Sequence, residues 1–91
     1  MLVTVDIGNT NITIGIFDKE DLIGTYRLTT KVRRTSDEYG FMLKNFLDRS
    51  NVHEKQIDSV IVSSVVPKVM HSFTNGINLF FMYIRTIQKV F

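Results

Sequence analysis

One short polar segment near the N-terminus has the residue types that bind phosphate and a divalent metal. The segment Asp6-Ile7-Gly8-Asn9-Thr10-Asn11 separates two apolar runs rich in β-branched residues, at positions 2–5 and 12–17. This pattern predicts a strand, a tight turn and a returning strand. Gly8 and Asn9 tolerate left-handed backbone, and short polar side chains satisfy the amides of such turns. An ordinary polar hairpin turn is the competing interpretation, because motifs this short also occur by chance.

Asp6 is the residue that an ordinary hairpin explains least well. Alternate residues of a strand share a face, so Asp6 lies with Leu2 and Thr4, opposite Val3 and Val5. A carboxylate at the end of an apolar strand is costly to bury unless a charge partner or a metal compensates it. The adjoining turn is rich in hydrogen-bond donors. Asp6 is therefore a candidate metal ligand in a pocket for a metal-bound polyphosphate.

The composition indicates one small globular domain or part of a larger protein. The chain has 91 residues, 44% of them hydrophobic and 22% charged, and its formal net charge is +2. That charge is too small to indicate nucleic-acid binding, and we interpret the basic residues 31–34 as a solvated connection. The sequence has no cysteine for a disulfide or a metal site. We find no signal peptide, and the longest apolar run (79–84) is too short to cross a membrane, so we expect a cytoplasmic protein.

The middle of the chain predicts a third strand followed by a helix. Residues 22–30 alternate in the manner of a strand, and residues 35–51 have apolar positions at helical spacing. Thr35 and Glu38 form a capping-box pattern at the start of this helix. Tyr39 falls on its apolar stripe, so we expect it in the core, although its hydroxyl leaves a functional role open.

A second strand-to-helix junction follows. Residues 57–62 predict a strand covered on both faces, and Pro67 suits the first position of a helix. Ligands of α/β sheets bind at such junctions, which makes Ser63, Ser64 and Val65 a candidate ligand loop. Capping of the helix by Ser64 explains these residues equally well.

The C-terminal segment has a different character. Phe80, Ile84, Ile87 and Phe91 continue the helical period of the preceding residues. We therefore predict a half-domain over residues 1–77 and a divergent, helical apolar tail over 78–91. Large apolar groups, including Met82, surround such a helix. We expect an apolar surface that drives self-association, formed by Phe80, Phe81, Tyr83, Ile84 and Phe91.

The predicted elements have the order βββαβα. The helix at 35–51 supplies the crossover that parallel pairing of the first and fourth strands requires. This order is typical of a single half-domain of the α/β actin-like ATPase (ribonuclease H-like) fold, which sugar kinases share. Proteins of that superfamily contain two such half-domains and bind nucleotide in the cleft between them.

Three segments resemble the N-terminal part of type III pantothenate kinases, bacterial enzymes of coenzyme A biosynthesis. They are the segment at 6–11, Arg34-Thr35-Ser36-Asp37-Glu38-Tyr39-Gly40, and Ser63-Ser64-Val65-Val66-Pro67. The resemblance covers residues 1 to about 77. It implies a phosphotransferase that moves the γ-phosphate of ATP to pantothenate and works as a homodimer. It also implies Mg²⁺ with ATP and a monovalent cation, K⁺ or NH₄⁺.

The resemblance also implies which residues hold the phosphates. The Gly-x-Asp-Arg segment that carries the family's catalytic base has no counterpart here, and neither does the second half-domain. We therefore expect a truncated chain that has no catalytic residue of its own and is inactive alone. The alternative is a non-catalytic half-domain that binds nucleotide or a partner through its sheet edge and tail. The implied phosphate-binding residues, with Asp6 also binding the metal, are Asp6, Ile7, Gly8, Asn9, Thr10, Asn11, Ile12 and Thr13.

Overall fold

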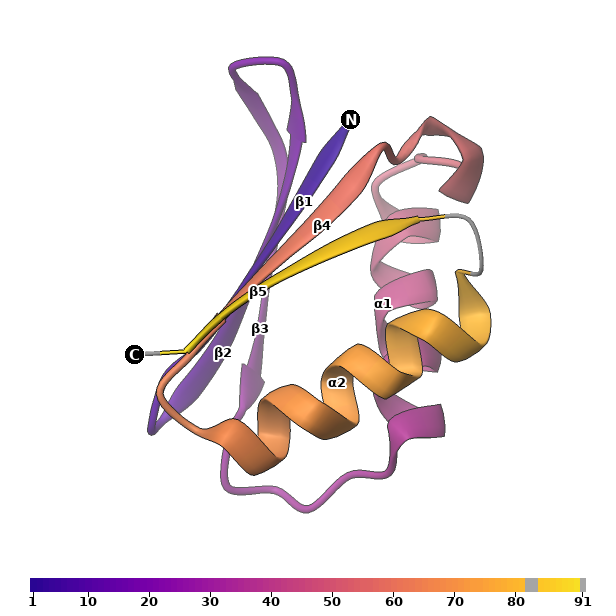
Figure 1. The fold of residues 1–91 in the computed structure, drawn as a ribbon. Coiled ribbons are helices and arrows are strands. Elements are labelled where there is room, and N and C mark those ends of the chain that lie inside the picture. Colours follow the sequence, from indigo (N-terminus) through magenta and orange to yellow (C-terminus); the bar gives the residue numbers. More distant parts are fainter. Residues whose placement is uncertain (82–83, 91) are drawn as a thin grey trace.

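A computed structural model describes residues 1–81 and 84–90, which form a five-stranded sheet with both α-helices on one face (Figure 1). The strand order is β3-β2-β1-β4-β5. No helix among the described residues is long and apolar enough to cross a membrane. The elements are β1 (Leu2–Ile7), β2 (Asn11–Asp18), β3 (Asp21–Thr29), α1 (Ser36–Arg49), the short 3-10 helix η1 (Glu54–Gln56), β4 (Ser59–Ser64), α2 (Pro67–Phe80) and β5 (Arg85–Val90).

The strand pairing confirms the predicted topology. β1 pairs antiparallel with β2 and parallel with β4, and β2 pairs antiparallel with β3. Parallel neighbours need a crossover connection, and α1 lies in that connection, on the helical side of the sheet. The three N-terminal strands therefore form a meander, and β4 returns beside β1.

The ends of α1 follow from local sequence chemistry. The Thr35 amide donates to Glu38 Oε1 at 2.9 Å, and the Glu38 amide donates to Thr35 Oγ1 at 3.2 Å. This is the predicted capping box, which satisfies two amides at the helix start. After the C-cap residue Ser50, Asn51 has a φ of 58°, the left-handed conformation that ends many helices.

The core lies between the sheet and the two helices. Tyr39 is 2% exposed and packs against Phe73 with ring centroids 5.0 Å apart, so its predicted place in the core is confirmed. The sheet contributes alternate residues of three strands to this core: Val3, Val5, Ile7, Ile12, Ile14, Ile16, Val60 and Val62.

The fourth strand differs from the prediction in its residue bounds and in how many of its faces are covered by other elements. It spans Ser59–Ser64 rather than 57–62, because the Ile57 amide donates to the Glu54 carbonyl at 3.1 Å and closes η1. Ile61, on the face away from the helices, is only half-buried. Both α-helices lie on the other face, so the expectation of a strand covered on both faces is wrong for the described residues.

The predicted helical tail is also wrong. α2 ends at Phe80, and Arg85–Val90 forms β5, which pairs parallel with β4. The Phe81 amide donates to the Ile77 carbonyl at 2.8 Å, and its side chain is 3% exposed within the core. Pairing with β4 supplies backbone hydrogen bonds that a continued helix would have made within itself.

These contacts change the expected apolar surface of the tail. Phe81 belongs to the core, and the half-buried Phe80 and Ile84 pack against it. Met82, Tyr83 and Phe91 lie outside the described residues. The exposed apolar side chains of the described C-terminal region are instead Leu79, Ile87 and Val90.

The two helices approach each other at a pair of glycines. A Cβ atom added to Gly76 would lie 2.8 Å from the backbone nitrogen of Gly40, and one added to Gly40 would lie 2.6 Å from the Gly76 carbonyl oxygen. Both distances are shorter than Cβ atoms adopt in proteins. The helix backbones therefore contact each other directly at this crossing.

We predict that Gly76→Ala destabilises the fold. The added methyl group meets backbone rather than a flexible side chain, so the helices must separate, at a cost of about 1–3 kcal/mol. Urea unfolding measures this loss. Gly8→Ala is a milder comparison, because its added Cβ would lie 3.2 Å from the Asn11 carbonyl oxygen, a tight contact that a shift of a few tenths of an ångström relieves. A Gly76→Ala variant as stable as the wild type would contradict the close helix contact.

Candidate nucleotide-binding site

The two candidate loops lie at the same edge of the sheet. Because β1 and β4 are parallel, their carboxyl ends are neighbours, and the turn after β1 lies beside the connection from β4 to α2 (Figure 1). The register places Asp6 opposite Ser63 and Ile7 opposite Ser64. The Val65 amide then donates to the Ile7 carbonyl at 3.1 Å. The structure thus brings together the first and third of the sequence motifs.

The turn after β1 is held by its own backbone and by the end of β3. The Gly8 amide donates to the Asn11 carbonyl at 2.9 Å. Thr30 donates its amide to the Thr10 carbonyl at 2.9 Å and its hydroxyl to the Gly8 carbonyl at 2.8 Å. Neither Gly8 nor Asn9 has a positive φ, so the left-handed backbone that their residue types allow is not used.

Thr30 is a residue of this site that the sequence analysis missed. It is 6% exposed and contributes two of the hydrogen bonds that hold the turn. The sequence shows only a threonine at the end of a predicted strand, and many such threonines have no special role. Its importance follows from the β2–β3 pairing, which brings residue 30 beside the turn.

Asp6 is exposed and points away from the core, because its neighbours along β1, Val5 and Ile7, are buried against the helices. Ser63 Oγ lies 3.4 Å from Asp6 Oδ1, which is long for a hydroxyl–carboxylate hydrogen bond. Across residues 1–81 and 84–90, the Asp6 carboxylate has no other hydrogen-bond or ion-pair partner. The expected burial of this carboxylate is therefore wrong, and its oxygens are open to a ligand.

The described residues do not form a metal site of three or more clustered acidic, histidine or cysteine side chains. Mg²⁺ does not need such a cluster, because it is often bound by one or two carboxylates together with water and substrate phosphates. The open Asp6 carboxylate beside the Ser63 hydroxyl fits a Mg²⁺ ion that arrives with a polyphosphate.

The members of the candidate loop after β4 have different surroundings. Ser64 is 1% exposed, and its Oγ accepts from the Val66 amide at 2.8 Å and donates to the Val66 carbonyl at 2.9 Å. Ser64 therefore closes the turn, while the N-cap of α2, Val66, has no side-chain cap. Ser63 is half-buried beside Asp6, and Val65 is exposed.

The other predicted phosphate-binding residues divide between the turn and the core. Asn9, Thr10 and Asn11 are exposed at the turn. Ile7 and Ile12 are fully buried, so only their backbone is available to a ligand. Beyond the turn, Thr13 is half-buried and pairs with Asp6 across the two strands.

The second motif, residues 34–40, contacts the end of β3 through Arg34. Arg34 Nη1 donates to the Thr29 carbonyl at 2.7 Å, and its guanidinium carbon lies 5.9 Å from the centre of the Tyr39 ring. This contact holds the end of β3, directly before Thr30. The motif therefore connects the helix α1 to the strand that fixes the turn.

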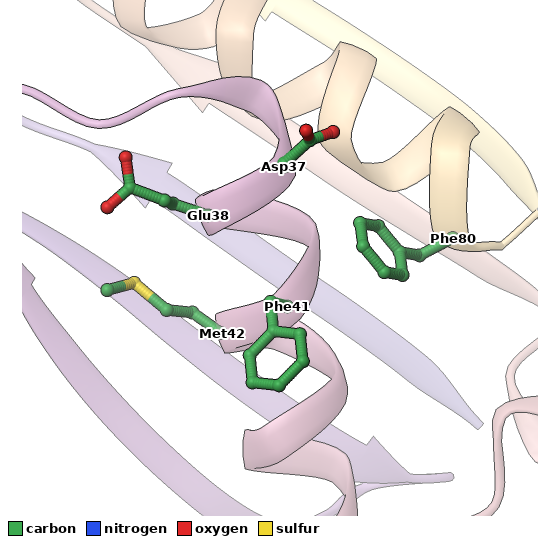
Figure 2. Close-up of a pocket in the computed structure, with 5 residues that line it drawn as sticks. All are labelled: Asp37, Glu38, Phe41, Met42 and Phe80. Atoms are coloured by element: carbon green, nitrogen blue, oxygen red, sulfur yellow. The ribbon is translucent and has the colours of Figure 1, made fainter.

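A hollow between the helices is not a phosphate site. It has a volume of about 590 Å³ and lies at the first turn of α1 and the last turn of α2 (Figure 2). Its lining includes two acidic residues, Asp37 and Glu38, whose carboxylates would repel phosphate. The remaining lining residues are Phe41, Met42 and Phe80.

Comparison with known proteins decides the family. A family model described as type III pantothenate kinase matches residues 2–89. The chain belongs to the type III pantothenate kinase family. The match includes most of the segment after residue 77, so the family resemblance extends beyond the three motifs and into β5.

Two relatives show how much of the family's length the chain represents. It is 57% identical over 77 residues to the type III pantothenate kinase of Bifidobacterium longum (strain DJO10A), covering 85% of this chain and 30% of that protein. It is 47% identical over 81 residues to the type III pantothenate kinase of Agathobacter rectalis, covering 89% of this chain and 31% of that protein. The chain thus spans about 30% of the length of the pantothenate kinases it matches.

A solved structure supports the fold of this chain. ROK hexokinase from Thermus thermophilus superposes with a TM-score of 0.66 at 14% identity, over 98% of this chain and 33% of that protein. At this identity the likeness concerns the fold alone. It confirms an α/β half-domain of the actin-like ATPase fold.

We predict that Thr30→Val loosens the turn after β1. Valine keeps the shape of threonine but leaves the Gly8 carbonyl without its donor, a loss of about 1 kcal/mol. Urea unfolding measures the loss, and faster exchange of the Gly8 amide hydrogen locates it. Thr29→Val, at the exposed neighbouring position, is the control and should change stability by less than about 0.5 kcal/mol. Equal exchange rates in Thr30→Val and wild type would show that the hydroxyl does not hold the turn.

Proposed function

We propose that this chain is the phosphate-binding half of an ATP-dependent pantothenate kinase of coenzyme A biosynthesis, acting in the cytoplasm. The observation that supports this most directly is the open Asp6 carboxylate beside Ser63, next to a turn held by Thr30, in a chain of the type III pantothenate kinase family. An ordinary hairpin turn does not require a carboxylate at that place that has no ion-pair partner among the described residues.

The site suits phosphoryl transfer because that reaction depends mainly on positioning and on stabilising negative charge. Asp6 would hold the Mg²⁺ ion that accompanies ATP. The exposed side chains of Asn9, Thr10 and Asn11 would donate to phosphate oxygens. Gly8 leaves room for them, since an added Cβ would have only the Asn11 carbonyl oxygen within 4 Å.

Pantothenate, K⁺ or NH₄⁺, and a homodimeric assembly belong to the proposal through the family. The first relative is about three times as long as the segment it shares with this chain, because that segment covers 30% of its length. We infer that turnover requires groups contributed by the rest of such a protein, including the base that accepts the pantothenate proton. Alone, this chain would bind Mg²⁺–ATP weakly and transfer no phosphate.

A second candidate function is a non-catalytic half-domain that binds nucleotide or a partner protein. The observation that favours it is the edge strand β5, where Ile87 and Val90 are 40% and 54% exposed. Edge strands offer unpaired backbone groups to another chain. Phosphorylation of pantothenate by a complex of this chain with the remaining segment of a longer family member would favour the kinase over this alternative.

We predict that Asp6→Asn removes the metal-dependent part of ATP binding without unfolding the chain. The substitution keeps the shape and removes the charge, so the affinity for Mg²⁺–ATP should fall roughly tenfold while the affinity for metal-free ATP does not fall. Because Asp6 is exposed, the free energy of unfolding should change by less than about 0.5 kcal/mol. Calorimetric titration with and without Mg²⁺, beside thermal melts, measures both quantities.

Asp48→Asn is the matched control, because Asp48 is also exposed but lies on α1, away from the turn. It should bind Mg²⁺–ATP as the wild type does. Two results would contradict the proposed site. One is a wild-type chain that binds no Mg²⁺–ATP at millimolar concentration, and the other is equal affinity in Asp6→Asn and the wild type.

A further inference from the structure

The open face of the sheet carries one polar row next to the turn. The strand register aligns five residues across the sheet, and residues directly opposite each other in neighbouring strands share a face. The next row, farther from the turn, carries no charged residue. From β3 to β5, the polar row consists of Arg27, Thr13, Asp6, Ser63 and Lys89.

Arg27 is fixed on this face by its neighbours along β3. Tyr26 points to the helices, where its ring stacks on Phe46 with centroids 4.4 Å apart and its hydroxyl bonds to Ser50 Oγ at 2.6 Å. Leu28 also packs against the core. Since side chains alternate along a strand, Arg27 must point to the open face.

No polar contact among the described residues ties the Arg27 guanidinium to the rest of the fold. The side chain is exposed, and within residues 1–81 and 84–90 it makes no hydrogen bond or ion pair. Arg34, by contrast, is already bonded to the Thr29 carbonyl. An arginine with five free donors is therefore available on the same face and in the same row as Asp6.

The spacing suits a ligand that carries both a metal and phosphate. Neighbouring strands lie about 4.8 Å apart, so the backbones of Arg27 and Asp6 are roughly 10 Å apart, with Thr13 between them. The two charges do not pair directly. A chain of phosphates above Thr13 would place its metal at Asp6 and its free oxygens at the guanidinium, which binds such oxygens through two parallel hydrogen bonds.

We propose that Arg27 is a phosphate-binding residue of this site and that the polyphosphate lies across β2, over Thr13. The inference rests on the proposed function and extends it to β3, which none of the three sequence motifs includes. It assigns the row from Arg27 to Asp6 as the binding surface for a metal-bound triphosphate.

The test is Arg27→Gln in the 91-residue chain, titrated with Mg²⁺–ATP, Mg²⁺–tripolyphosphate and adenosine. Loss of a charge-assisted bidentate contact should weaken the binding of both polyphosphates about tenfold and leave the affinity for adenosine unchanged. Arg27→Lys keeps the positive charge but lacks the planar guanidinium that makes two parallel hydrogen bonds. Its affinity for both polyphosphates should therefore lie between those of the wild type and Arg27→Gln. Thermal melts show whether each variant folds. If Arg27→Gln does not fold, the polyphosphate affinity of Arg27→Lys is compared with that of the wild type instead.

Arg33→Gln is the matched control, because Arg33 is also exposed and lies in the loop after β3. It should weaken tripolyphosphate binding by less than about twofold. If Arg27→Gln and Arg33→Gln behave alike while Asp6→Asn still abolishes the Mg²⁺ effect, this inference is overturned and the proposed function stands. If the wild type binds no polyphosphate, or Asp6→Asn binds as the wild type does, the proposed function fails and this inference fails with it.

Discussion

The parallel pairing of β1 with β4 is the constraint on which the rest of the site depends. It aligns Asp6 with Ser63 and brings the two strand-end loops to one edge of the sheet. The register is held by apolar packing on the opposite face, where Val5 and Val62 are nearly inaccessible to solvent. A shift of β1 by one residue would turn Asp6 into the core and Val5 to solvent. The position of the carboxylate is thus secured by residues that never contact a ligand.

The helices secure the same arrangement from the other side. α1 is the crossover that makes the parallel pairing possible, and its backbone contacts α2 where Gly40 meets Gly76. Arg34, just before α1, bonds to the end of β3, and the following Thr30 holds the turn after β1. A continuous set of contacts therefore runs from the helix layer to the turn. Arg34 of the second family motif thus supports the turn through its bond to the end of β3.

Local chemistry made part of this fold predictable. The capping box at Thr35 and the β-branched runs around Asp6 are signals that neighbouring residues complete among themselves, and these elements occur as expected. In the C-terminal segment such local signals do not predict the structure. Its apolar residues at 80, 84 and 87 fit a helical period, but Arg85–Val90 forms a strand because β4 offers an unpaired edge. The exposure of Asp6 was equally hidden, since it depends on which face the helices cover.

The candidate site was predictable only where it is continuous in sequence. Arg27 lies in β3 and Thr30 directly follows that strand, so their positions beside Asp6 and the turn depend on how β1, β2 and β3 pair. Charge alone does not organise this surface, because two unit charges about 10 Å apart in water interact by only about 0.4 kcal/mol. The hydrogen bonds of the turn and the apolar packing behind it fix the geometry before any ligand arrives. A half-site of this kind gains most of its electrostatic strength when a second half excludes water, since the same charges then act in a lower dielectric.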